Sequence, residues 1–284
     1  GVLRALARPH CSVLSRTLYS PVMSSDSPFD LTGRVALITG GNSGIGLGMA
    51  EGLAAHGADV AIWGTNAEKN ERALDVLSEY DVELLSIVCD VSDESAVIES
   101  MQETADALGR IDAVFVNAGV SGTSPSFLEM TSEDWRRVMS VNLDGAFYTA
   151  REAAKHMVGR FDEGDLSGGS IVFTSSGSSE FGSASGQHYG ATKAGVNAMM
   201  RGIAVAHARH NIRCNSILPG WIESDMTANA FGWDKFVDKV MPRIPSRRWG
   251  TKEDFAGIAT YLASSASSYH TGDIIRIDGG FHSF

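Results

Sequence analysis

The sequence predicts an α/β fold in which one doubly wound parallel sheet carries helices on both faces. Apolar segments of strand type alternate with helical segments from residue 29 onward, which is the pattern of a parallel sheet covered on both sides. A glycine-rich turn follows the first of these strands. The 284 residues are 43% hydrophobic and 20% charged, which is typical of a globular chain that forms one large domain.

The strands are expected where short apolar runs are bounded by turn residues, and the first of them reads Arg-Val-Ala-Leu-Ile-Thr. In order, the predicted strands are residues 34–39, 59–63, 83–88, 112–117, 169–175, 212–217 and 273–277. The predicted helices are residues 44–56, 67–80, 94–108, 132–158, 191–210 and 252–263. Residues 221–249 interrupt the alternation, and their aromatic and Met content predicts a mobile flap over a site. We therefore expect residues 29–284 to form the catalytic domain, with 221–249 as its substrate flap.

The first 28 residues differ from the rest of the chain. They contain Arg4, Arg8 and Arg16, several serines, and no acidic residue before Asp26. Leucines and arginines fall on opposite sides of a helical projection, which resembles a mitochondrial transit peptide, although Pro9 would interrupt a single helix. The segment is either a targeting signal or a flexible leader, so the cytoplasm is expected and the mitochondrial matrix is the alternative.

Charge and cysteine content exclude several classes of function. The formal net charge of −11 argues against a nucleic-acid partner, and no apolar stretch is long enough to predict a membrane span. Cys11, Cys89 and Cys214 are an odd and scattered set, which favours a reducing compartment over a disulfide framework. No spacing of Cys or His predicts a metal site.

The glycine-rich turn predicts a dinucleotide site in a Rossmann-like sheet. Thr39-Gly40-Gly41-Asn42-Ser43-Gly44-Ile45-Gly46 follows a strand and opens a helix. Glycines let the backbone turn tightly and approach a pyrophosphate, and the helix N-terminus offers it free N–H groups and a positive dipole end. The spacing differs from Gly-x-Gly-x-x-Gly and is instead Thr-Gly-x-x-x-Gly-Ile-Gly.

That pattern resembles the short-chain dehydrogenase/reductase family, and the resemblance runs from about Leu31 to Gly280 in motif order. The motifs are Asp90-Val91, Asn117-Ala118-Gly119, Asn142 within Val-Asn-Leu, Tyr189-Gly-Ala-Thr-Lys193 and Pro219-Gly220. The resemblance implies an NAD- or NADP-dependent oxidoreductase acting between a secondary alcohol and a ketone. It implies cofactor contacts from these motifs, from the glycine turn, and from Thr65, Ile222 and Ser224. Asn117-Ala118-Gly119 could instead be a structural turn, and Asp90 a helix cap.

Four residues are predicted to carry the chemistry. Tyr189 and Lys193 are four apart, so on a helix they share a face, and an ammonium beside a phenol would lower its pKa. The resemblance makes Tyr189 the acid–base residue and gives Lys193 a second contact with the nicotinamide ribose. It makes Ser176 the substrate-orienting serine by its spacing of thirteen residues before Tyr189, with Ser175, Ser178 and Ser179 as competitors. It gives Asn142 a bend in its helix and a water next to Lys193.

The end of the second strand bears on the choice of cofactor. An acid there would bind the ribose hydroxyl of NAD, and an arginine would favour the phosphate of NADP. Thr65 is neither, and Asp59 lies at the opposite end of the strand. The turn carries Asn42 and Ser43 rather than a basic residue, although Lys69 could reach the phosphate. NAD is therefore favoured modestly.

The substrate pocket is expected to be partly apolar, walled by Phe181, Gln187, Trp221 and residues 231–233. The sequence does not select a substrate among the many classes used by such enzymes. Two alternatives stay open: a 3-oxoacyl carrier-protein reductase, and a nucleotide-binding protein without turnover. The apolar faces of the helices at 132–158 and 191–210 and the family resemblance predict a homotetramer.

Overall fold

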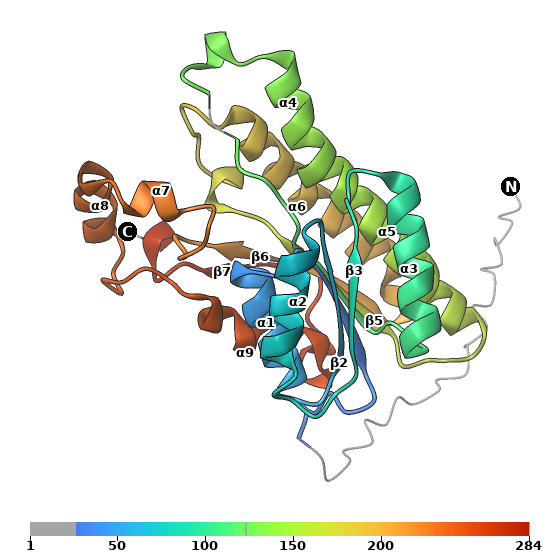
Figure 1. Ribbon diagram of the computed structural model, residues 1–284. Coiled ribbons are helices and arrows are strands. Elements are labelled where there is room, and N and C mark those ends of the chain that lie inside the picture. The colour runs from blue at the N-terminus through green and yellow to red at the C-terminus, as the bar shows by residue number, and fades with distance from the viewer. Residues whose placement is uncertain (1–26, 123, 284) are drawn as a thin grey trace, which may run out of the picture.

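The computed structural model describes residues 27–122 and 124–283 and contains a seven-stranded parallel sheet (Figure 1). The strand order is β3-β2-β1-β4-β5-β6-β7. The chain therefore starts in the middle of the sheet at β1, builds outward to β3, and then returns to place β4 beside β1. This doubly wound parallel sheet confirms the predicted fold class. Its order reverses between β1 and β4, where sheets of this type form a ligand crevice at the carboxyl ends of the strands.

The strands fall at the predicted segments, with ends that differ by one or two residues. They are β1 Val35–Thr39, β2 Asp59–Gly64, β3 Leu84–Val88, β4 Ala113–Val116, β5 Gly169–Thr174, β6 Ile212–Pro219 and β7 Ile274–Ile277. The central strands are buried along their whole length because helices cover both faces of the sheet. Adjacent residues of a strand point to opposite faces, so Leu37 and Ile38 enter two different cores.

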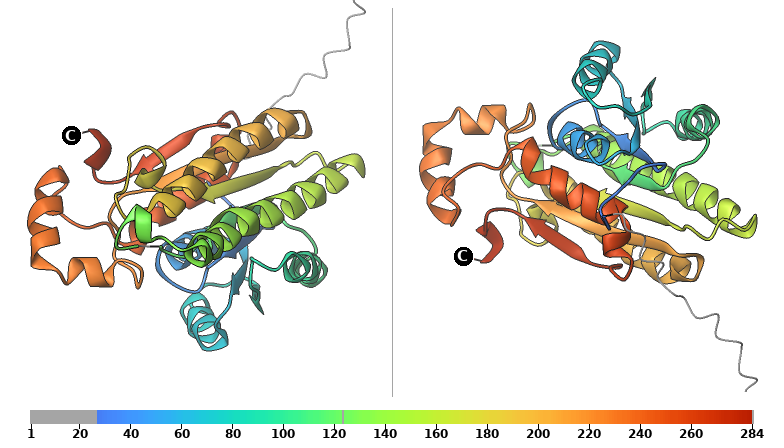
Figure 2. Two further views of the ribbon diagram at one scale, coloured as in Figure 1. Left: turned by 90° about the horizontal axis from the view of Figure 1, so that it is seen from above. Right: turned by 90° about the horizontal axis from the view of Figure 1, so that it is seen from below.

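The helices form one layer on each side of the sheet (Figure 2). One layer contains α1 Gly44–Ala54, α2 Ala67–Leu77 and α9 Ala256–Ala263, which pack on the core that includes Ile38, Met49 and Phe255. The other layer contains α3 Glu94–Leu108, α5 Gly145–Asp162 and α6 Gln187–His207, which pack on the core that includes Leu37 and Met200. The two cores hold the sheet rigid, and its carboxyl edge is thereby a fixed platform for a site.

Two predicted helices differ from those in the structure. The region at 132–158 is not one regular helix, because a π-helical turn at Ser140–Asp144 separates α4 Ser132–Met139 from α5; the turn contains Asn142, where the resemblance implied a bend. The helix predicted from residue 191 begins at Gln187, which places Tyr189 inside its first turn. Glycine has a low helix propensity, so Gly190 disfavours a helix that starts here. In the structure Gly190 packs against the backbone of Ser178, and this contact with a distant loop favours the earlier start.

Residues 221–249 form a segment of short helices beyond the carboxyl edge of the sheet. It contains α7 Ala228–Phe231 and α8 Asp234–Val240, which project from one side of the molecule in Figure 1. A backbone bridge between Ile222 and Gly250 closes its base. The predicted division into a catalytic domain with a mobile substrate flap stays a prediction.

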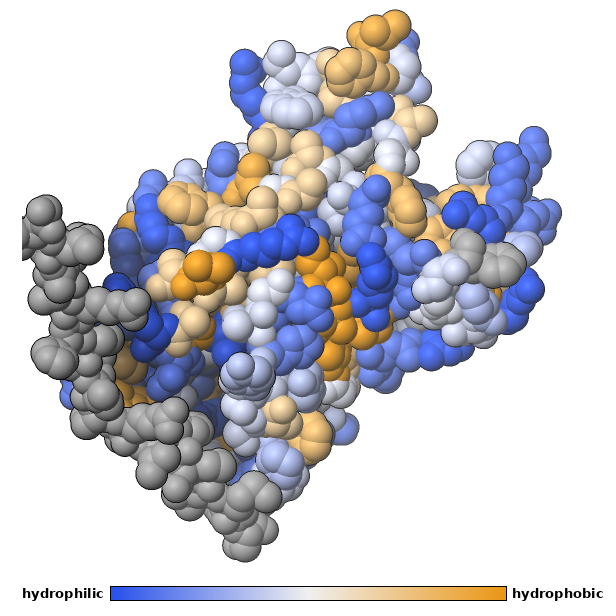
Figure 3. Space-filling view, turned by 180° about the vertical axis from the view of Figure 1, so that it is seen from behind, coloured by the Kyte–Doolittle hydropathy of each residue, from blue (hydrophilic) through white to orange (hydrophobic). Residues whose placement is uncertain are grey.

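No helix within residues 27–122 and 124–283 is both long enough and apolar enough to cross a membrane. The leader predicted at the N-terminus lies almost entirely outside the described residues. On the face shown in Figure 3, hydrophobic side chains reach the surface as a narrow strip and smaller patches between hydrophilic ones.

Candidate active site

The glycine turn that joins β1 to α1 has the shape of a cradle. Gly40 and Gly44 have φ angles of +63° and +51°, a region that side chains other than glycine rarely adopt. A side chain at Gly46 would overlap the carbonyl oxygen of Gly40. The turn therefore needs glycine at these three positions.

The N-terminus of α1 differs from those of the next three helices. Asn66, Asp93 and Thr131 cap α2, α3 and α4 through their side chains. Ser43, at the same position of α1, makes no capping hydrogen bond with any described residue. Backbone N–H groups of the first turn of α1 are thus free to bind an anion, and together with the glycine cradle they fit a pyrophosphate.

Asn42 supports the cradle from the side. Its Nδ2 donates to Asn70 Oδ1 at 2.7 Å, and Asn70 Nδ2 donates to the carbonyls of Gly64 and Ile87 at 3.2 Å each. This chain of amides ties the turn to α2 and to the ends of β2 and β3. Asn42, predicted as a cofactor contact, therefore has a bracing role in the structure.

The end of β2 lies beside the cradle and presents Thr65, which is exposed. Asp59 sits at the opposite end of β2, as expected, where its carboxylate accepts from Glu83 N at 2.9 Å. Lys69, in the first turn of α2, does not point free into solvent. Its Nζ donates to the carboxylate of Asp225 at 2.7 Å, so the sequence-distant segment after β6 reaches the end of β2.

Asp90 and Val91 follow β3 at the same edge. The Asp90 carboxylate accepts from the backbone N and the hydroxyl of Ser92, at 2.9 and 2.7 Å, which fixes the turn before α3. Asp90 is exposed, whereas Val91 is buried against Gly145 at the start of α5. Asp93, rather than Asp90, caps α3.

Asn117 joins the ends of three strands. Its Nδ2 donates to the Thr39 carbonyl at 3.0 Å, and its Oδ1 accepts from the Thr174 hydroxyl at 3.0 Å. The backbone N–H groups of Asn117 and Ala118 both donate to the Thr39 hydroxyl. The Asn117-Ala118-Gly119 motif therefore has the structural role that was left open for it. Its hydrogen bonds join the carboxyl ends of β1, β4 and β5.

Gly119 brings two of the predicted catalytic residues together. A Cβ at Gly119 would lie 3.3 Å from Asn142 Oδ1 and 3.6 Å from Lys193 Nζ. Asn142 belongs to the π-helical turn, and its side-chain amide exchanges two hydrogen bonds with the backbone of Val120, at 2.8 and 2.9 Å. Asn142 thus anchors the helix to the loop after β4, while the water assigned to it by resemblance stays a prediction.

Ser176 lies at the start of the turn that follows β5. Its Oγ accepts from Ser178 N at 3.2 Å, and its side chain lies near enough to the Tyr189 phenol to lower the pKa of that group. The competing serines have other partners, because Ser175 Oγ donates to the Lys193 carbonyl at 3.1 Å and Ser179 Oγ donates to the Ser176 carbonyl at 2.7 Å. Of the serines compared, Ser176 is the one that faces Tyr189.

Lys193 is buried beneath Tyr189. Its Nζ donates to the Thr174 carbonyl at 2.8 Å and lies 5.6 Å from the centre of the Tyr189 ring. No ion pair joins Lys193 to a carboxylate in the part of the chain that the structure describes. Burial therefore lowers the pKa of the ammonium to about 8.

The expected lowering of the Tyr189 pKa is wrong for this arrangement. Burial raises the pKa of the phenol, and the neighbouring Ser176 side chain offsets only part of that rise. The ammonium of Lys193 points to the backbone of β5 rather than to the phenol oxygen. Tyr189 therefore stays protonated at neutral pH, which is the form that donates a proton.

The predicted substrate residues lie around two aromatic clusters. Phe181 stacks on His282, with ring centres 4.6 Å apart. Trp221 packs edge-on against Phe236 at 4.8 Å, and Phe231 stacks on Trp249 at 4.1 Å. Phe231 was predicted to wall the pocket, but its stacking shows that it also holds the flap segment together.

Gln187 is the first residue of α6, and its Nε2 donates to the Ala184 carbonyl at 2.8 Å. His282 was missed by the sequence reasoning. Its Nδ1 lies 2.6 Å from the Asp278 carboxylate, and its ring would contact a side chain at Gly177, the residue after Ser176. Only the fold brings the C-terminal turn to this loop, so no local motif could have indicated it.

The segment after β6 completes the rim of the site. Pro219 ends β6, and Gly220 N donates to the Ile277 carbonyl at 2.9 Å. The side chain of Ile222, predicted as a cofactor contact, is buried in the core. Ser224 lies against the cradle, since a Cβ at Gly44 would be 3.4 Å from Ser224 Cβ.

Comparison with known proteins gives matches along nearly the whole chain. A family model described as enoyl-(acyl carrier protein) reductase matches residues 40–282, a region that includes Ser176, Tyr189 and Lys193. The gluconate 5-dehydrogenase of Gluconobacter oxydans is 34% identical over 258 residues, which are 91% of this chain and 98% of that protein. The 3-oxoacyl-(acyl-carrier-protein) reductase of Chlamydia pneumoniae is 36% identical over 250 residues, 88% of this chain and 97% of that protein. A solved gluconate 5-dehydrogenase from Burkholderia cenocepacia, in complex with NADP and tartrate, has a TM-score of 0.82 at 33% identity and covers 90% of this chain and 98% of its own.

Proposed function

The chain belongs to the short-chain dehydrogenase/reductase family, and we propose that Tyr189 moves the proton when it interconverts a secondary alcohol and a ketone. The enzyme is an NAD(P)-dependent oxidoreductase, as its relatives are. The observation that carries the role of Tyr189 is its position at the carboxyl edge of the sheet, beside the Ser176 side chain and over the buried ammonium of Lys193.

In ketone reduction, Tyr189 donates its hydroxyl proton to the carbonyl oxygen of the substrate. Ser176 hydrogen-bonds the same oxygen and fixes it beside the phenol. The pKa of Tyr189 is raised by burial, so the proton is present at neutral pH. In alcohol oxidation, the same two residues act in reverse, and the phenolate then accepts the proton.

The cradle at Gly40, Gly44 and Gly46 and the uncapped N-terminus of α1 would hold the pyrophosphate of the dinucleotide. Lys193 would hold the nicotinamide ribose through the donors of Nζ that Thr174 does not use. The dinucleotide, when bound, supplies or accepts the hydride at the substrate carbon. Orientation of the substrate and control of the proton are the contributions of this chain.

The function is tested by turnover on a panel of alcohols and ketones with NAD and NADP, followed by the absorbance of the reduced cofactor. The panel includes sugar acids, because gluconate dehydrogenases are among the relatives, as well as polyols and cyclic ketones. We expect turnover on at least one class, and loss of that turnover in Tyr189→Phe. Cofactor binding without turnover on any member would favour a nucleotide-binding protein instead.

A second candidate is reduction of a 3-oxoacyl carrier-protein thioester. The Chlamydia pneumoniae relative favours it, and the matching family model is described by a different reductase of carrier-protein thioesters. The net charge of −11 opposes it, since an acidic carrier protein needs a basic docking surface. Rapid reduction of acetoacetyl thioester with NADPH would select this candidate, and slow reduction beside rapid turnover of a sugar acid would reject it.

We propose a modest preference for NAD over NADP. Thr65 is short and neutral, so it accommodates a ribose hydroxyl but does not neutralise a phosphate. Thr65→Arg is expected to shift kcat/KM towards NADP, because charge-assisted bonds to phosphate are worth roughly 1.5–3 kcal/mol each. A wild-type enzyme that already prefers NADP by about tenfold would contradict this reading.

We also propose a homotetramer, and the cytoplasm or the mitochondrial matrix as its compartment. Phe147 on α5 and Val205 on α6 are exposed apolar side chains on the two helices that carry the predicted interfaces. Cys89 and Cys214 are buried free thiols, and proteins of reducing compartments rarely rely on disulfides. Light scattering tests the assembly, and a fluorescent fusion with and without residues 1–28 tests the compartment.

A further inference from the structure

Asp225 lies near the end of β2, where the adenosine ribose of the coenzyme is expected to bind, although it is far from the cofactor motifs in the sequence. Its carboxylate pairs with Lys69 Nζ at 2.7 Å, across 156 residues of chain. The neighbouring Ser224 lies against Gly44 of the glycine cradle. The segment after β6 therefore spans the crevice from the cradle to the first turn of α2.

A hydrogen-bonded turn holds Asp225 at this place. The Thr227 hydroxyl donates to the Ile222 carbonyl at 2.6 Å and accepts from Ser224 N at 3.1 Å. The base of the turn is closed by the bridge between Ile222 and Gly250. Asp225 thus projects from a fixed backbone, although its side chain is 81% exposed.

Lys69 is held from the other side. Its backbone N donates to Asn66 Oδ1 at 2.9 Å, the capping bond of α2, so its place in the first turn is fixed. It is the first cation after the end of β2, four residues beyond Thr65. The Lys69 ammonium is therefore the cation that would pair with a phosphate on the adenosine ribose.

We propose that Asp225 is the acidic residue that sets the coenzyme preference of this enzyme, because it neutralises Lys69. The inference rests on the proposed function and deepens it. NAD carries a hydroxyl at the ribose position and leaves the Lys69–Asp225 pair intact. NADP carries nearly two further negative charges, which must displace the Asp225 carboxylate from Lys69 or lie beside it. The acid that the end of β2 lacks is thereby supplied by the segment after β6.

Solvent exposure of both side chains limits the size of the effect. The Lys69 side chain is 39% exposed, and exposed pairs of this kind are screened by water and salt. The expected change is therefore severalfold rather than a hundredfold. Low ionic strength enlarges it and is the condition for the measurement.

The test is isothermal titration calorimetry of the full chain with NAD and with NADP. In Asp225→Asn, we expect the affinity for NADP to rise by about fivefold and the affinity for NAD to stay nearly unchanged. Adding Lys69→Met to Asp225→Asn is expected to remove that gain, since the freed ammonium is its source. Asp238→Asn on α8 is the matched control, because it removes one exposed carboxylate of the same segment that has no ion pair among the described residues.

Three results would overturn the proposal. They are a ratio of the two affinities that moves by less than about twofold in Asp225→Asn, an equal gain in Asp238→Asn, and a gain that survives Lys69→Met. The first two would show that the pair does not discriminate, and the third that Lys69 is not involved. Failure of wild type to bind either dinucleotide is a different result, because it would overturn the proposed function itself.

Discussion

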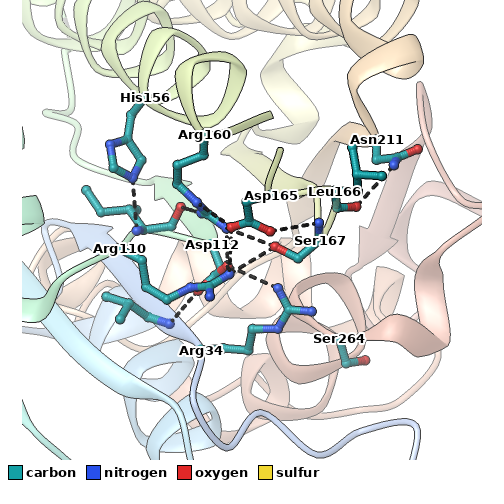
Figure 4. A network of polar contacts seen from close by, with 12 residues as sticks. Arg34, Arg110, Asp112, His156, Arg160, Asp165, Leu166, Ser167, Asn211 and Ser264 are labelled. Atoms are coloured by element: carbon teal, nitrogen blue, oxygen red, sulfur yellow. Dashed lines mark hydrogen bonds and ion pairs between the residues drawn. The ribbon is translucent and has the colours of Figure 1, made fainter. Parts of the chain in front are cut away.

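Each end of the sheet contains a buried charged side chain, but the surroundings of the two charges differ. At the amino end, Asp112 precedes β4, is 4% exposed, and meets Arg34, Arg110 and Arg160 (Figure 4). At the carboxyl end, Lys193 is equally buried but meets no carboxylate among the described residues. One end surrounds a buried charge with opposite charges, whereas the other leaves a buried charge available to a ligand.

The Asp112 carboxylate has hydrogen-bond donors at both oxygens. Oδ1 accepts from Arg110 Nη2 at 2.6 Å, and Oδ2 accepts from Arg110 Nε at 2.8 Å and from Val35 N at 3.0 Å. Burial alone would raise the pKa of Asp112, but the bonds from Arg110 and the charges of Arg110 and Arg160 bring it below its usual value. The network therefore favours the folded state at neutral pH.

The difference between the surroundings of Asp112 and Lys193 indicates which end of the sheet contributes to stability and which contributes to function. A buried group whose charge is satisfied is costly to disrupt, and its donors and acceptors are not available to a ligand. A buried group whose charge is unsatisfied disfavours folding, yet it is ready to bind or to exchange a proton. The carboxyl end contains the second kind, so substitutions at the two ends are expected to have opposite signatures.

The largest expected effect is on catalysis at the carboxyl end. Tyr189→Phe removes only the acidic hydroxyl, so turnover is expected to fall by about 10²–10⁴-fold. Cofactor affinity and the unfolding midpoint should change little. Tyr80→Phe, in the turn between α2 and β3, is the matched control and should retain full turnover. A Tyr189→Phe enzyme with more than half of the wild-type kcat would show that another group moves the proton.

Next in size is a loss of stability at the amino end. Asp112→Ala removes the carboxylate that three arginines share, but Arg110 and Arg160 keep Asp165 as a partner, so the cost is expected at the low end for a broken buried ion pair, about 3 kcal/mol. We expect the free energy of unfolding in urea to fall by that amount while kcat of the folded enzyme stays the same. Asp81→Ala, an exposed acid between α2 and β3, should leave both unchanged. Equal stability of Asp112→Ala and wild type would mean that the network is neutral, and the contrast between the ends would be lost.

The sequence indicated the fold and most of the site because both depend on local patterns. Apolar runs located all seven strands, and the glycine turn located the cradle. What the sequence did not indicate depends on contacts between distant segments. The resemblance implied a bend at Asn142, but the sequence did not show that Val120 anchors it or that the partners of Lys69 and Gly177 come from the last third of the chain.

The pKa of Tyr189 was misjudged for a related reason. Spacing on a helix indicated that an ammonium would lie near the phenol, but it could not indicate that Lys193 would be buried and would donate to the Thr174 carbonyl. Burial depends on the packing of β5 and of the loop after β4 around them. In the structure, burial outweighs the expected effect of the nearby ammonium, so the pKa of Tyr189 is raised rather than lowered.

A smaller effect separates two adjacent serines at the carboxyl end. Ser176→Ala removes the hydroxyl that faces Tyr189, and loss of one donor to a reacting oxygen lowers kcat by about 10²-fold. Ser175→Ala removes a hydrogen bond to the Lys193 carbonyl and should cost about 1 kcal/mol of stability with little change in kcat. The two variants are controls for each other, and the reverse pattern would assign the substrate-orienting role to Ser175.

The smallest expected effect concerns Lys193 and the pH dependence of stability. Burial lowers the pKa of this ammonium to about 8 in the folded protein, from the usual 10.5. Between these values the unfolded chain binds a proton that the folded protein has released, so stability rises with pH in that window. Lys193 should therefore disfavour folding at pH 7 and cease to do so above pH 10, a change on the order of 1–3 kcal/mol. Lys193→Met should be more stable than wild type at pH 7, lose turnover, and lack the rise between pH 8 and 10. Urea unfolding of both proteins across that range gives the slopes, and parallel slopes would mean that the ammonium is already satisfied in the folded protein, as Asp112 is at the other end of the sheet.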